Sequence, residues 1–165
     1  MKRVFLSIGF LFAVMAMFAE TQSKLSKKDD EVCFYFPLEK DFKISAGYGE
    51  RKDPTTESVF FHNGIDLVAE SGTDVYSAGE GKVLMTGFNS NYGNFVIVGH
   101  RNGYQTLYAN LSKILVEVND SVTRKTKLGL VGNTGISTGP HLHFAISKDG
   151  EYVDPEAHCI NLRYR

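Results

Sequence analysis

Apolar residues along most of this chain come in short runs of three or four, and glycines separate the runs. Only one of the 16 glycines, Gly9, lies before residue 46. The runs are rich in β-branched and aromatic residues, which favour strands. They lie at 83–85, 95–98, 106–108 and 143–146. Short strands with turns at this spacing predict an all-β fold of antiparallel strands, a sandwich or a barrel-like sheet.

The first 31 residues differ in composition from the rest of the chain. Lys2 and Arg3 precede an apolar run, Val4–Phe18, of 15 residues, which is short for a membrane span of about 20 residues. A positive segment followed by such a run is typical of a secretory signal peptide. The chain is therefore expected to contain a signal peptide at 1–19, a flexible linker at 20–31, one folded domain at 32–160 and a C-terminal tail at 161–165.

The signal peptide predicts export, either to the periplasm or to the outside of the cell. An N-terminal anchor that is not cleaved is the alternative, and once the signal is removed no transmembrane span is expected. Removal of residues 1–19 takes away only two basic residues and leaves 16 basic against 19 acidic side chains, a net charge of −3. Because a nucleic-acid-binding surface would be strongly basic, no nucleic-acid partner is expected.

The two cysteines, Cys33 and Cys159, stand near the two ends of the predicted domain. Export would allow them to form a disulfide. In the chain-entropy account, a bridge that closes nearly the whole domain contributes about 5 kcal/mol. The bridge is the expectation and two buried free thiols are the alternative, since the sequence alone does not show that the two ends meet.

Three of the five histidines and one aspartate lie in two short segments, 62–66 and 141–143. Imidazole and carboxylate groups are the ligands of a zinc ion that keeps an open coordination position. Each segment alone is weak evidence for a metal. Together, and each beside glycine-rich turn residues, they predict a zinc site.

The spacing within the two segments has different geometric consequences. On a strand, His141 and His143 project to one face and lie about 6.6 Å apart. His62 and Asp66 would lie about 13 Å apart on a fully extended strand, which is too far for one ion. The Asn-Gly pair between them is a strong turn signal, and we expect it to bend the chain so that the two side chains converge.

From about residue 44 to residue 155 the chain resembles the lysostaphin-like (LytM-type) zinc metallopeptidase domain. The resemblance rests on motifs that stand in order along the chain: Gly47-Tyr48-Gly49-Glu50-Arg51 with Pro54, His62-Asn63-Gly64-Ile65-Asp66, Gly72-Thr73-Asp74-Val75, Tyr92-Gly93-Asn94, Thr106-Leu107-Tyr108, and Gly135-Ile136-Ser137-Thr138-Gly139-Pro140-His141-Leu142-His143-Phe144. The last motif is the most specific. Enzymes of this family cut peptide cross-links in bacterial cell walls, so the resemblance implies that peptidoglycan peptides are the substrate.

The resemblance also implies a role for each polar residue of the two segments. It makes His62, Asp66 and His143 the zinc ligands, and it makes His141 the catalytic histidine beside the metal. Three protein ligands leave a fourth position for water, as a catalytic site requires. The metal would lower the pKa of that water and polarise the scissile carbonyl, while His141 would accept a proton or stabilise the oxyanion.

The chain departs from the family at Asn110, where relatives usually carry a second active-site histidine. Asparagine can donate a hydrogen bond to an oxyanion but cannot transfer a proton, and a lost proton transfer costs about 10²–10⁴-fold in rate. If Arg101–Gly103 is a hairpin loop, residue 110 pairs with residue 94. His100 then lies about 20 Å from Asn110, so we interpret His100 as structural. His158, near the end of the chain, is interpreted as structural or exposed.

Several further residues are candidates for substrate contacts. Arg51 suits a substrate carboxylate, because a guanidinium can bind it through two parallel hydrogen bonds; an arginine that fixes a loop is the alternative. Asn94 allows the same two interpretations. Tyr108 is expected either to line the groove, together with Tyr48 and Tyr92, or to lie in the core or at its rim.

With the predicted signal peptide and zinc site, the resemblance implies an exported zinc metalloendopeptidase that hydrolyses stem peptides or cross-bridges of peptidoglycan. The three metal ligands favour an enzyme, because a pure binding module does not need them. Asn110 favours the alternative, a catalytically weakened relative that binds wall peptides or activates another cell-wall hydrolase. A domain with a purely structural zinc is disfavoured, because the sequence shows no clear fourth protein ligand.

Overall fold

The computed structural model describes residues 32–39, 42–52 and 57–160. The structure described below belongs to one compact unit, which begins at Cys33. The predicted signal peptide, linker and C-terminal tail lie outside the described residues. Within the described part of the chain, no helix is long and apolar enough to cross a membrane.

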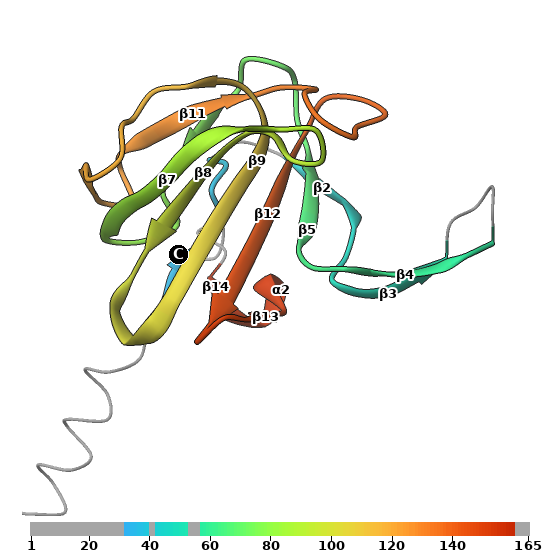
Figure 1. The fold of residues 1–165 in the computed structure, drawn as a ribbon, viewed down its shortest axis with the longest axis horizontal. Coiled ribbons are helices and arrows are strands. Elements are labelled where there is room, and N and C mark those ends of the chain that lie inside the picture. Colours follow the sequence, from blue (N-terminus) through green and yellow to red (C-terminus); the bar gives the residue numbers. More distant parts are fainter. Residues whose placement is uncertain (1–31, 40–41, 53–56, 161–165) are drawn as a thin grey trace, which may run out of the picture. The chain divides into compact units, whose positions relative to one another are not determined.

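Strands form almost all of the regular structure (Figure 1), which confirms the predicted all-β class. The α-helix of the described residues, α2 (Pro155–His158), is a single turn, and a 3-10 turn occupies Arg101–Gly103. The strands are β1 (Phe34–Tyr35), β2 (Lys43–Ala46), β3 (Gly49–Lys52), β4 (Val59–His62), β5 (Ile65–Val68), β6 (Asp74–Tyr76), β7 (Gly81–Asn89), β8 (Gly93–Gly99), β9 (Tyr104–Ile114), β10 (Ser121–Val122), β11 (Lys127–Val131), β12 (His141–Lys148), β13 (Glu151–Val153) and β14 (Cys159–Ile160).

Ten of these strands form one large sheet, whose main path runs in the order β10-β7-β8-β9-β12-β5-β2. The pairs along this path are antiparallel, as predicted. Off the path, β11 pairs with both β9 and β6, and β13 pairs with β12. β3 and β4 form a separate antiparallel hairpin, which leads directly into β5. The two central strands, β9 and β12, therefore have partners on both edges.

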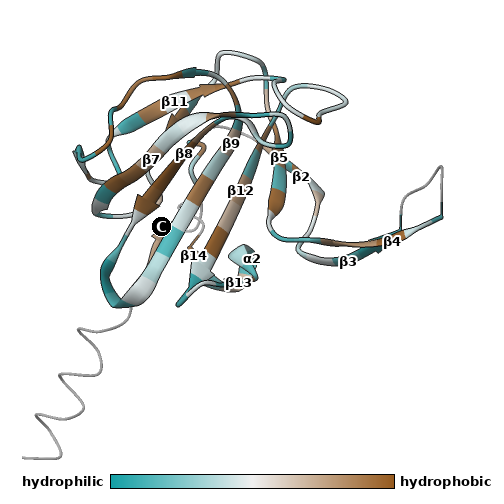
Figure 2. Cartoon of the chain, in the orientation of Figure 1, coloured by the Kyte–Doolittle hydropathy of each residue, from teal (hydrophilic) through white to brown (hydrophobic). Residues whose placement is uncertain are grey.

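The two faces of the large sheet bury different side chains. The register aligns Val96, Tyr108 and Phe144 on one face, and all three are fully buried. The other face carries a smaller apolar cluster of Phe95, Leu107, Ala109 and Ala145. Figure 2 shows hydrophobic residues along β8, β9 and β12 and a hydrophilic connection between β8 and β9. Strand alternation puts His143 on the face of Ala145, so the face with the smaller cluster holds the candidate site.

Tyr108 lies at the centre of a buried polar chain on the core face. Its hydroxyl accepts the Ala78 N–H at 2.7 Å and lies 2.9 Å from Thr106 Oγ1. Thr106 Oγ1 lies 2.8 Å from His100 Nε2, and His100 Nδ1 donates to the Glu80 carbonyl at 2.7 Å. Burial raises the pKa of Tyr108 to about 12. Tyr108 therefore belongs to the core, and the prediction that it lines the groove is wrong.

The hairpin between β8 and β9 has the predicted loop, the 3-10 turn at 101–103, but not the whole predicted register. Asn94 pairs with Leu111, because the register shifts between Asn94 and Val96. The expected pairing of residue 110 with residue 94 is wrong by one position. The physical cause is an extra residue in β9: Asn110 has a left-handed backbone, with φ of 62°, and forms a bulge.

The chain ends of the domain do meet, but not in a way that joins the cysteines. β1 and β14 pair in parallel, with Phe34 opposite Cys159. Cys33 precedes Phe34, so strand alternation turns it away from the face that Phe34 and Cys159 share. Both thiols are free, and Cys33 is exposed. The expected disulfide is therefore absent from this structure, because side chains on opposite faces cannot be bridged without backbone movement.

We expect the free energy of unfolding to fall as the pH drops below about 6.5, the pKa of an ordinary histidine. Burial lowers the pKa of His100, so the unfolded chain takes up a proton at this residue more readily than the folded chain does. The stability that comes from a neutral His100 is complete above the unfolded pKa and is lost as the pH falls through the folded pKa. Urea unfolding at several pH values measures the effect.

The matched variants are His100→Gln and His158→Gln. Glutamine does not titrate, so the first variant should lack this part of the pH dependence, while the second should retain it. His158 is the control because its Nδ1 donates to the Asp154 carbonyl within its own helical turn. Stability curves of the wild type and His100→Gln that run parallel below about pH 6.5 would contradict the assignment.

Candidate metal centre

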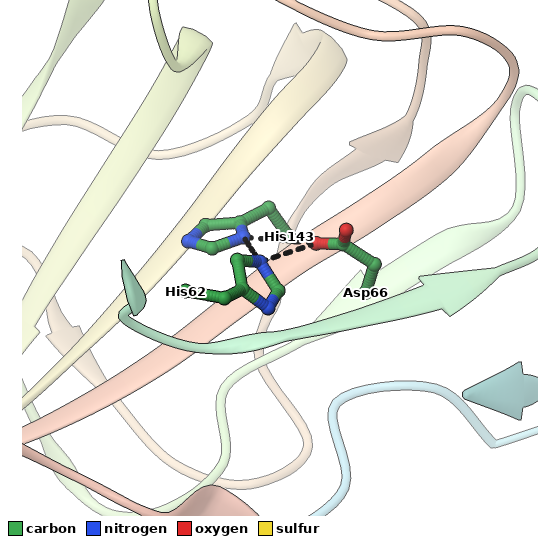
Figure 3. Close-up of side chains that lie close together, drawn as sticks. All are labelled: His62, Asp66 and His143. Atoms are coloured by element: carbon green, nitrogen blue, oxygen red, sulfur yellow. Dashed lines mark hydrogen bonds and ion pairs between the residues drawn. The ribbon is translucent and has the colours of Figure 1, made fainter. Parts of the chain in front are cut away.

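Three elements bring His62, Asp66 and His143 together (Figure 3). His62 is the last residue of β4, Asp66 lies in β5 and His143 lies in β12. The antiparallel pairing of β12 with β5 sets His143 directly opposite Asp66. The chain bends between β4 and β5, as the Asn-Gly pair predicted, and this bend returns His62 to Asp66.

Gly64 allows the bend to lie against β12. A Cβ at this position would sit 2.4 Å from the Phe144 carbonyl oxygen and 3.0 Å from His143 Cε1. The first distance is shorter than a Cβ tolerates beside a backbone atom, so the close approach requires glycine. The structure therefore gives a packing reason for glycine in this turn.

The three donor atoms have the spacing of ligands around one small ion. His143 Nδ1 lies 2.9 Å from Asp66 Oδ1. His62 Nε2 lies 3.2 Å from His143 Nδ1 and 3.3 Å from Asp66 Oδ1. A tetrahedral ion with bonds of about 2.0–2.1 Å separates its ligands by about 3.3 Å. The observed distances thus fit a tetrahedral site that the protein fills from three directions.

Contacts behind the cluster orient the two imidazoles. His62 Nδ1 lies 2.8 Å from the Gly47 carbonyl oxygen, so this nitrogen must donate and Nε2 keeps its lone pair in the neutral ring. The ring of Tyr92 stacks on the ring of His143, with centroids 5.8 Å apart and an interplanar angle of 26°. Nε2 of His143 is buried and has no hydrogen-bond partner among the described residues, so Nδ1 is the ring nitrogen that faces the cluster.

The electrostatics of the cluster keep Asp66 ionised. Burial, the largest single effect, raises the pKa of Asp66, but the hydrogen bonds from His143 and His62 and the charges of both rings together lower it far below its usual range. For His62, burial lowers the pKa, while the hydrogen bonds to Asp66 and to the Gly47 carbonyl raise it more. A half-buried negative charge faced by two imidazoles is a site that favours a cation.

His141 lies two residues before His143 on β12 and on the same face. Its Nδ1 lies 2.8 Å from the Gly139 carbonyl oxygen and 3.2 Å from Ser137 Oγ. Its Nε2 faces the cluster, 3.9 Å from Asp66 Oδ1. Because a carbonyl can only accept, Nδ1 carries the proton and Nε2 of the neutral ring has a free lone pair.

Asn110 lies beside the cluster in the sheet, because its neighbour Ala109 pairs with His143. The Asn110 side chain is almost fully buried. Its Nδ2 donates to the Thr134 carbonyl at 2.7 Å, and its backbone N–H donates to the Tyr92 carbonyl at 2.7 Å. The side chain therefore ties β9 to the loop before β12, and its role in catalysis stays a prediction.

The two other candidates for substrate contacts differ in their surroundings. The Asn94 Nδ2 donates to the Leu111 carbonyl at 2.9 Å, so this side chain links β8 to β9. Arg51 is half-buried in β3, and its positive charge acts to lower the pKa of His62. Arg51 is thus close enough to the cluster to affect the pKa of His62. Its contact with substrate stays a prediction.

One residue of the site, Tyr152, carried no signal in the sequence. Asn63 Nδ2 donates to the Tyr92 hydroxyl at 2.9 Å, and Tyr152 bonds to the same hydroxyl. Burial, followed by this bond to Tyr92, raises the pKa of Tyr152 to about 12. Its backbone carbonyl accepts the Tyr48 hydroxyl at 2.7 Å. Tyr152 comes from β13, a short strand whose pairing with β12 the sequence pattern does not indicate.

Comparison with known proteins places this geometry in a family. Residues 60–155 match the sequence model of the family described as "Peptidase family M23". The chain is 42% identical over 120 residues to the peptidoglycan DD-endopeptidase ShyA of Vibrio cholerae, and this match covers 72% of the chain and 28% of ShyA. The chain therefore spans well under half the length of this relative.

Solved structures with the same fold include two peptidases. A zinc containing peptidase from Vibrio cholerae has a TM-score of 0.71 and 39% identity, over 75% of this chain and 39% of that one. The catalytic domain of the antimicrobial peptidase lysostaphin from Staphylococcus simulans has a TM-score of 0.63 and 30% identity, over 70% of this chain and 90% of that one. The family match covers more than half of the sequence and includes all three cluster residues and His141. The chain belongs to peptidase family M23.

Proposed function

We propose that this protein is a zinc metalloendopeptidase that hydrolyses peptide bonds in the stem peptides or cross-bridges of peptidoglycan. The observation that carries the proposal is the convergence of three donor atoms, from His62, Asp66 and His143, at mutual distances of 2.9–3.3 Å. ShyA, a relative, is a peptidoglycan DD-endopeptidase, and a similar solved structure is that of a zinc containing peptidase. Both descriptions support the same chemistry for this chain.

The donor set suits a catalytic zinc rather than a structural one. Two imidazoles and one carboxylate, His62 Nε2, His143 Nδ1 and Asp66 Oδ1, would hold the ion, and the cluster of described residues supplies three ligands, not four. When bound there, zinc polarises the scissile carbonyl and lowers the pKa of an attacking water molecule. The hydrogen bond behind His62 is the one expected of a metal ligand, because the ring nitrogen that does not face the cluster donates to the Gly47 carbonyl.

His141 is the residue we assign to proton transfer. Its Nδ1 is fixed by the Gly139 carbonyl, which directs the free lone pair of Nε2 to the cluster. As a water oxygen forms its bond to the carbonyl carbon, Nε2 can take one proton from that water. The same nitrogen can then give the proton to the amine as the C–N bond breaks.

Three further residues have proposed supporting roles. Arg51 would bind a substrate carboxylate, because its guanidinium lies close enough to the cluster to influence His62. Asn110 would support the oxyanion through the second hydrogen of its amide, since the first is bound to Thr134. Asn94 would position the bulged part of β9 through its bond to Leu111.

A second candidate function is a catalytically weakened relative that binds wall peptides or activates another cell-wall hydrolase. The observation that favours it is Asn110, whose amide cannot transfer a proton and is already bound to the Thr134 carbonyl. In either case we propose that the protein is exported and acts in the periplasm or elsewhere in the cell envelope. The supporting feature is the sequence at 1–19, with its two basic residues and its apolar run.

We expect the purified protein to bind one zinc ion per chain. Replacement of a ligand, in His62→Ala or His143→Ala, should weaken zinc binding by more than about 100-fold, since loss of outer contacts alone costs about 10–100-fold. His158→Ala should bind zinc as the wild type does, because His158 lies outside the cluster. Metal analysis after dialysis against a zinc buffer measures the stoichiometry. Equal zinc content in all four proteins would refute the site.

We expect the zinc-loaded protein to release new peptide termini from purified cell walls, and mass spectrometry of the digest detects them. His141→Ala should lower the rate by about 10²–10⁴-fold, because it removes the proton transfer. The zinc content of this variant should be unchanged, which separates a catalytic role from loss of the metal. If His141→Ala cleaves as fast as the wild type, the proton passes through another group.

We expect Asn110→His to raise kcat/KM on the same substrate by at least about tenfold, since histidine restores a second group that can transfer protons. The control is Asn94→His, which also replaces an asparagine that bonds to a backbone carbonyl, and it should bring no gain. Thermal unfolding shows whether each variant is folded. An unchanged rate in a folded Asn110→His protein would mean that Asn110 already supplies what the reaction needs.

A further inference from the structure

The sheet face that holds the metal cluster also contains an apolar pocket. The pocket has a volume of about 150 Å³ and lies over β7, β8, β9 and β12. The register aligns four of its lining residues in one row across these strands: Met85 with Ile97, Ile97 with Leu107, and Leu107 with Ala145. Phe95 and Tyr152 complete its apolar walls.

This row is the next one along the strands from the metal cluster. Ala145 follows His143 by two residues on β12, which places the two side chains on one face about 6.6 Å apart. Tyr92 joins the two sites, because it lines the pocket and its ring stacks on His143. An extended substrate spans about 3.3–3.6 Å per residue, so the pocket lies one or two residues away from a bond held at the cluster.

The pocket selects by polarity and by size. None of the described residues that line it is charged, and Thr106 directs its hydroxyl to His100 and Tyr108 on the other face. The other polar residues of the lining, Asn89, Gln105 and Ser147, are uncharged. A charged group placed there would lose hydration and meet no opposite charge, which is costly. A pocket of about 150 Å³ has room for a group as large as benzene. The pocket therefore suits a small, uncharged, apolar side chain.

We propose that this pocket is a specificity subsite that receives the uncharged apolar side chain of the substrate residue one or two positions from the scissile bond and excludes charged side chains there. The methyl group of an alanine is the smallest occupant that this chemistry admits. The inference rests on the proposed peptidase function, because a substrate at the metal cluster defines the subsite.

Cleavage of synthetic wall-type peptides tests the subsite. Alanine is compared with glutamate in two pairs of peptides, which vary the first position from the cleaved bond in one pair and the second position in the other. In one of the pairs, the wild type should prefer the alanine peptide by at least about tenfold in kcat/KM, a difference of about 1.4 kcal/mol. Met85→Lys should reduce this preference at least about tenfold, because it adds a positive charge at the pocket mouth.

Phe88→Lys is the matched control. Met85 and Phe88 lie on the same strand and are 51% and 67% exposed, so a lysine at either position can reach solvent and the fold should tolerate both. Phe88 does not line the pocket, and its variant should keep the wild-type preference. Equal effects of the two lysines, or no effect of Met85→Lys, would overturn the proposal.

Binding of small probes tests the pocket independently of cleavage. Benzene should shift the NMR signals of the Ile97 and Ala145 methyl groups in the zinc-loaded wild type, and benzoate should not. If benzene binds but the protein cuts no peptide, the pocket stands and the proposed peptidase function fails. If benzene leaves both methyl signals unchanged, or if benzoate shifts them equally, the pocket inference fails whatever the activity.

Discussion

The pairing of β12 with β5 is the constraint on which the metal centre depends. It sets His143 opposite Asp66, and a slip of one residue would turn one of these side chains to the other face of the sheet. The register is held from both edges of β12, because Phe144 also pairs with the buried Tyr108 of β9. The precision of the site is thus a property of the sheet, and the apolar core behind it supplies the rigidity.

The third donor depends on a close backbone approach. Gly64 lets the chain turn against β12, where a side chain would collide with the Phe144 carbonyl. The Gly47 carbonyl fixes the His62 ring, and Gly47 lies two residues before the first strand of the β3–β4 hairpin. The hairpin and the large sheet therefore meet at the metal cluster. A shift of either would change the distances between the donor atoms of His62, Asp66 and His143.

Local sequence signals were sufficient for most of the fold and for the cluster. The predicted apolar runs lie within β7, β8, β9 and β12, and the Asn-Gly turn brings His62 to Asp66 as expected. Alternation along a strand shows which residues share a face, but it does not show which face meets the core. The sequence therefore left open whether Tyr108 lines the groove or lies in the core, and the structure places it in the core.

Other features depend on long-range register, which local patterns do not contain. The bulge at Asn110 shifts its pairing by one position, and the parallel pairing of β1 with β14 turns Cys33 away from Cys159. The apolar row from Met85 to Ala145 is assembled from four strands. None of its members is unusual in its own segment, so the pocket becomes visible only when the strands are paired.

The left-handed backbone at position 110 limits which amino acids can stand there. Apart from glycine, asparagine, aspartate and histidine are the residues that adopt this conformation most readily, and β-branched residues are nearly excluded. A change between histidine and asparagine is therefore conformationally inexpensive, because either fits the same bulge. A lineage can gain or lose a proton-transferring group here without rebuilding the sheet, so the chemistry at this position can evolve separately from the fold.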